Sequence, residues 1–113
     1  MLHIIGTMKE AHLLQNNLHK DVFAKLCEHI STLEHYYGAD RNYWEEGGYV
    51  LLAETIEDLQ QAKEYIDFTQ HLYEWADLIS KESGYISALY LANNDYTITL
   101  FLPQSIAPDC ILE

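Results

Sequence analysis

Four ionisable residues of this chain recur at helical spacing: Glu64, Asp67, His71 and Glu74. At about 100° per residue, a helix would place these side chains within an arc of about 80°. Asp67 and His71 are four residues apart, so both could reach one metal ion, and Glu64 or Glu74 could add an oxygen ligand. The same spacing is common on a solvated helix face, where Asp67 and His71 would form an ion pair. We favour the solvated face, because the chain lacks the second ligand set of a bundle metal site.

The other residues with chemical potential do not form a catalytic pattern. Cys27 and Cys110 are lone thiols with no Cys-x-x-Cys or Cys/His ligand spacing. The sequence does not decide whether the two form a disulfide. No serine or cysteine lies in a nucleophile signature. His12 and His19 are seven residues apart and His29 and His35 six apart, and neither pair supplies more than two ligands. The sequence therefore favours a protein that is not an enzyme and that carries no cofactor.

The net charge of −12, from eighteen acidic and six basic residues, is the strongest compositional signal. Such a field repels phosphates, so we expect no direct binding to nucleic acid. The apolar runs are too short to cross a bilayer, which takes roughly 20 residues as a helix. The start of the chain lacks a secretion signal. We therefore expect a cytoplasmic protein. From its charge, we expect it to bind a basic partner.

The segment Gly38 to Gly48 (GADRNYWEEGG) is a predicted loop, because it has three glycines and no sustained periodicity. Its tip carries two aromatic residues followed by two acids: Tyr43, Trp44, Glu45 and Glu46. Tyrosine and tryptophan are frequent at interaction hot spots. Large aromatic residues in loops also pack on their own domain. Both alternatives stay open for Tyr43 and Trp44.

A first helical segment is predicted from Thr7, whose hydroxyl and the carboxylate of Glu10 match a capping box. Apolar residues then recur every three or four positions as far as Tyr37, and Gly38 is placed to end the helix. Asn16 and its neighbour Asn17 compete for backbone hydrogen bonds. The segment is therefore one helix or two.

Tyr49 to Ala53 is predicted to be a buried strand, and Thr55 to cap a second helix that runs to about Lys81 or Ser83 and stops at Gly84. The apolar arc of this helix covers roughly 200°, about twice that of an ordinary surface helix. Either the sheet and the first helix both cover it, or part of it forms a homodimer interface. The candidate interface residues are Tyr65, Phe68, Leu72 and Trp75.

Two strand-like runs, 85–92 and 96–102, are predicted to form a hairpin with Asn93 and Asn94 as its turn residues. That turn sets a register in which Leu91 faces Tyr96 and Tyr85 faces Leu102. The whole chain, 1–113, is then one α+β domain of the order α-β-α-β-β. Its small antiparallel or mixed three-stranded sheet would carry two main helices on one face in a two-layer arrangement.

The sequence favours a small acidic interaction module of the inhibitor, immunity or DNA-mimic type that binds a basic partner protein. The candidate partner-binding residues are Tyr43, Trp44, Glu45, Glu46, Glu64, Asp67 and Glu74. The alternatives are a structural or regulatory subunit that forms a homodimer, and a metal-binding protein or enzyme that uses the stripe around Asp67 and His71.

Overall fold

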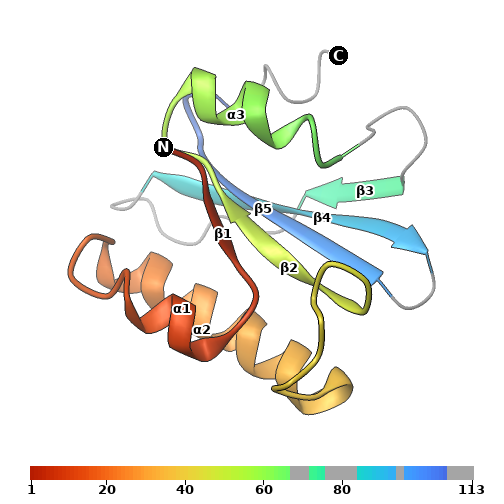
Figure 1. The fold of residues 1–113 in the computed structure, drawn as a ribbon. Coiled ribbons are helices and arrows are strands. Elements are labelled where there is room, and N and C mark those ends of the chain that lie inside the picture. The colour runs from red at the N-terminus through yellow and green to blue at the C-terminus, as the bar shows by residue number, and fades with distance from the viewer. Residues whose placement is uncertain (67–71, 76–83, 94–95, 107–113) are drawn as a thin grey trace.

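The computed structural model describes residues 1–66, 72–75, 84–93 and 96–106 (Figure 1). Helices and strands alternate irregularly along these residues. In chain order the elements are β1 (His3–Ile5), α1 (Met8–His12), α2 (Lys20–Tyr37), β2 (Gly47–Leu52), α3 (Ile56–Ala62), β3 (Leu72–Trp75), β4 (Tyr85–Asn93) and β5 (Tyr96–Pro103). The expected α+β class is confirmed.

The strands form one mixed sheet in the order β1-β2-β5-β4-β3. β2 and β5 run parallel, whereas the other three neighbouring pairs are antiparallel. The sheet is therefore larger than the three strands expected. β2 lies inside it and is buried along its whole length, which explains its nearly continuous apolar sequence.

Helices cover both faces of the sheet (Figure 1). Leu51 and Leu100 pack with residues of α3 on one face, whereas Val50 and Phe101 pack with α1 and α2 on the other. This division follows the alternation of side chains along a strand. α3 therefore forms a third layer, rather than joining the first helices on one face.

The first helical segment is two helices, which is one of the two alternatives. Thr7 caps α1, and its hydroxyl accepts a hydrogen bond from the Glu10 amide at 3.2 Å. α2 ends at Gly38, whose φ of 98° is easily adopted by glycine. None of the helices in the described part of the chain combines the length and apolar character needed to cross a membrane.

The expected long helix from Ile56 to about Lys81 is wrong. α3 is capped by Thr55 as expected, but it ends at Ala62, and Leu72–Trp75 forms the edge strand β3 beside β4. Leucine and aromatic residues fit a strand that can pair with a neighbour, so tertiary pairing overrides the helical spacing. No single helix face therefore carries both Glu64 and Glu74.

The expected hairpin register is wrong by one residue. Leu91 pairs with Thr97 and Tyr85 pairs with Pro103, and the ladder is irregular between Leu91 and Asn93. A slip of one residue moves each side chain to the other face of the sheet. Tyr85 accordingly packs on the α2 side, whereas Leu102 lies on the α3 side.

Candidate functional site

The loop between α2 and β2 is held by a buried cation, Arg41, which is only 9% exposed. Its Nη2 donates to the carbonyls of Gly6 at 2.7 Å and Gly48 at 3.0 Å, and its Nη1 donates to that of Gly38 at 3.3 Å. Burial lowers the pKa of Arg41, although nearby carboxylates, first that of Glu34, oppose the shift. A guanidinium remains charged even so. Arg41 therefore joins three backbone segments and fixes the base of the loop.

Tyr43 folds back onto its own domain. Its ring lies against Gly6, where a Cβ would collide with it. Its hydroxyl donates to Glu10 Oε2 at 3.2 Å, and Glu10 Oε1 accepts from the Gly6 amide at 3.0 Å. Burial, together with the Glu10 carboxylate, raises the pKa of Tyr43. For this residue the packing alternative describes the geometry.

Trp44 lies differently and remains 46% exposed. Its ring is 4.9 Å from that of Tyr49 and stacks on Tyr65, with a centroid distance of 5.9 Å and an interplanar angle of 26°. Tyr65, just beyond the end of α3, is 39% exposed. The fold thus brings together two residues that are far apart in sequence. We call these two rings and the acids beside them in the chain, Glu45, Glu46 and Glu64, the Trp44–Tyr65 surface.

The three carboxylates of this surface are exposed. The ion pairs found in the described part of the chain involve other acids, such as Asp58 with the Met1 ammonium. Glu45, Glu46 and Glu64 form none with a described residue. Their negative charge is therefore directed to solvent and to whatever approaches the stacked rings.

The other candidate residues were expected on a long second helix, which the structure does not contain. Asp67, Phe68 and His71 lie outside the described residues. Leu72, Glu74 and Trp75 belong to β3, so the expected helical dimer face does not exist, although each residue's role stays a prediction. Within the described ranges, no group of three or more His, Cys, Asp or Glu residues is placed to hold a metal ion. Cys27 is a free thiol, and burial raises its pKa.

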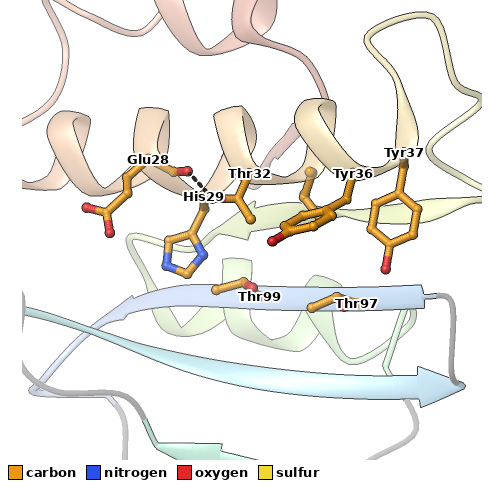
Figure 2. A pocket seen from close by; sticks show the side chains of 8 residues that line it. Glu28, His29, Thr32, Tyr36, Tyr37, Thr97 and Thr99 are labelled. Atoms are coloured by element: carbon orange, nitrogen blue, oxygen red, sulfur yellow. Dashed lines mark hydrogen bonds between the residues drawn. The ribbon is translucent and has the colours of Figure 1, made fainter.

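A cavity of about 340 Å³ lies between α2 and β5, apart from the loop (Figure 2). Its lining consists of Glu28, His29, Thr32, Leu33, Tyr36, Tyr37, Thr97 and Thr99. Burial lowers the pKa of His29, whose ring lies edge-on to Phe101 at 5.5 Å. The sequence analysis missed this cavity. The spacing of His29, Leu33 and Tyr36 puts them on one helix face, but the wrong hairpin register left their neighbours on β5 unknown.

Comparison with protein-family models, curated proteins and solved structures finds no match. The chemistry of the two sites is nonetheless distinct. The Trp44–Tyr65 surface carries exposed rings among three carboxylates, whereas the cavity is lined by hydroxyls, phenols, one imidazole, one leucine and the single carboxylate of Glu28.

Proposed function

We propose that the protein is an interaction module that binds a basic partner protein through the Trp44–Tyr65 surface. The observation that carries this proposal is the exposed stack of Trp44 on Tyr65, beside carboxylates that have no ion pair with a described residue. Tryptophan and tyrosine are enriched at interaction hot spots, where a few such rings supply most of the binding energy. Carboxylates around the rings select a partner with lysine and arginine.

The charge of the whole chain supports the same partner chemistry. A net charge of −12 attracts a basic protein over several ångströms and accelerates encounter. The aromatic stack would then anchor the complex after encounter. Inhibitors, immunity proteins and DNA mimics combine these two effects, and we place the protein in this functional class.

The loop is suited to this role because its supports are rigid. Arg41 donates to the carbonyls of Gly38 and Gly48 at the two ends of the loop and to that of Gly6, and the ring of Tyr43 covers Gly6. A surface that is ordered before binding avoids the conformational entropy cost of ordering on contact. Trp44 is therefore presented on a fixed support.

The proposal is tested by affinity capture from the source organism at about 50 mM and about 500 mM salt, a range over which exposed charges become screened. The expected result is a basic protein retained at the lower salt only. Purified partner is then titrated against the wild type and against Trp44→Ala. Trp44→Ala is expected to lose about 2 kcal/mol or more of the free energy of binding, as other hot-spot residues do.

Matched variants separate the surface from the total charge. The double variant Glu45→Gln with Glu46→Gln should weaken binding and reduce its salt dependence. Glu28→Gln with Glu57→Gln removes the same charge elsewhere, and it should weaken binding less. Tyr36→Ala, at a residue 73% exposed, is the control for Trp44→Ala. Capture that is insensitive to salt, or equal binding by Trp44→Ala, would contradict the proposal. A dimer that Trp44→Ala dissociates would assign the surface to a second copy of the chain.

A further inference from the structure

The cavity between α2 and β5 is lined by a threonine hydroxyl that has no hydrogen-bond partner among the described residues. Thr99 is only 4% exposed and lines the cavity from β5 (Figure 2). Its hydroxyl forms no hydrogen bond with any described residue, unlike that of Thr32, which donates to the Glu28 carbonyl at 3.0 Å. In the described part of the chain, the side-chain atom that is both buried and unpaired is Nε of Arg41, so the Thr99 hydroxyl reaches the open space of the cavity. The Thr99 hydroxyl is therefore available to hydrogen-bond a molecule that enters the cavity.

Other polar groups around the cavity, on residues that are half-buried or exposed, also have no hydrogen-bond partner among the described residues. Within the described part of the chain, no hydrogen bond is made by the ring nitrogens of His29 or by the hydroxyls of Tyr36 and Tyr37. Figure 2 shows these side chains on α2 facing the threonines of β5. The cavity thus offers donors and acceptors from both of its walls, in addition to the apolar side chain of Leu33.

The charge of the lining excludes an anion. Neither lysine nor arginine lines the cavity, and its one carboxylate, Glu28, is 69% exposed at the rim and lies 3.6 Å from Lys25. Burial lowers the pKa of His29, so its imidazole is neutral at pH 7. An anionic ligand would lose its hydration without meeting a positive charge.

The size and the aromatic lining indicate the shape of the occupant. A volume of about 340 Å³ lies within the range of small-molecule sites, roughly 300 to 1,000 Å³. The rings of Tyr36 and Tyr37 line the cavity, and aromatic rings pack well against planar molecules. We propose that this cavity binds an uncharged planar heterocycle, which exchanges hydrogen bonds with Thr99 and His29 and packs against the tyrosine rings. This site is separate from the Trp44–Tyr65 surface.

The test is a titration of the full chain with adenine, uracil and nicotinamide in turn. Binding is monitored through the amide resonances in two-dimensional NMR spectra. Saturable shifts of the cavity residues, Thr97 and Thr99 among them, are expected with at least one of these probes. Benzoate, which is planar but anionic, should bind at least about tenfold more weakly. Absence of saturable shifts with all three heterocycles would overturn the proposal, as would equal binding of benzoate.

Two variants assign the binding to the named groups. Thr99→Val keeps the side-chain shape and removes the hydroxyl, and His29→Phe keeps a ring against Phe101 and removes the nitrogens. Each variant should bind the best of the three heterocycles about tenfold more weakly, which corresponds to about 1.4 kcal/mol of binding free energy. His35→Phe, on the same helix but outside the cavity, should bind as the wild type does. Circular dichroism verifies folding, and if one variant unfolds, the other decides; wild-type affinity in a folded variant would overturn the assignment.

Discussion

Gly48 lies at the start of β2 with a φ of 96°, and its Cα faces the backbone of Thr97 on β5. A Cβ at this position would collide with the Thr97 carbonyl oxygen, which cannot move without disturbing the parallel pairing of the two strands. Gly38 also has a positive φ, of 98°, but a Cβ there would meet nothing within 4 Å. The two glycines therefore separate backbone strain from a steric clash.

We expect Gly38→Ala to lower the free energy of unfolding by about 1–3 kcal/mol, the usual cost of a strained backbone conformation. Gly48→Ala should cost more than about 3 kcal/mol, because the clash adds to the same strain. Urea unfolding of both variants followed by circular dichroism measures the difference. Equal losses would show that the Thr97 carbonyl does not restrict position 48.

At the residue scale, the sequence could identify the aromatic loop tip, but it could not tell which of its two rings is packed and which is exposed. Tyr43 and Trp44 are neighbours of similar chemistry, so composition left the same two alternatives for both. The structure separates them through a single absent side chain, because Gly6 leaves room for the Tyr43 ring. Tyr65 was identified as an interface candidate, but its stacking on Trp44 depends on where α3 ends. That long-range contact has no signal in local spacing.

At the element scale, α3 begins at a complete capping box. Asp58 is 2% exposed, and its Oδ2 accepts from the amides of Glu54 at 2.9 Å and Thr55 at 3.2 Å, while its Oδ1 lies 3.0 Å from the Met1 ammonium. Burial by itself would raise the pKa of Asp58. The hydrogen bonds and the ammonium outweigh it, so the pKa is lowered from 3.8.

A lowered pKa means that the folded state binds the proton of Asp58 less readily than the unfolded state does. The stabilisation is therefore present above about pH 4 and is lost as pH falls through the lower pKa of the folded state. Asp58→Asn should lower the free energy of unfolding by about 1–2 kcal/mol at pH 7, as for other lost caps. Urea unfolding at several pH values should show this difference narrowing below about pH 4. A difference that does not change with pH would mean that the Asp58 charge contributes nothing.

The starts and ends of elements were predictable where local chemistry determines them. Thr7 and Thr55 cap helices, and Gly38 ends one, because each satisfies backbone groups within a few residues. The three-residue strand β1 was missed, and Leu72–Trp75 was misread as helix, because their strand form depends on pairing with β2 and β4. The irregularity near Leu91 likewise shifted the register without a local signal.

At the scale of the whole molecule, eighteen acidic side chains belong to a chain of 113 residues, and the net charge of −12 opposes compaction. Arg41 is buried in the loop, and its charge acts on nearby carboxylates, first that of Glu34 and then that of Glu46. The acids of the Trp44–Tyr65 surface form no ion pair with a described residue that salt could weaken. Screening should therefore relieve repulsion among these groups more than it removes attraction.

We expect the free energy of unfolding in urea to rise by about 1 kcal/mol between about 0.05 and 0.5 M sodium chloride, as the Debye length shortens. Glu45→Gln with Glu46→Gln should be a few tenths of a kcal/mol more stable than the wild type at the lower salt, and should gain less from added salt. If salt destabilises the wild type, attractive pairs such as Asp58 with Met1 outweigh the repulsion. A less stable double variant would show that these glutamates support the fold, which would remove the premise that their charge is held for a partner.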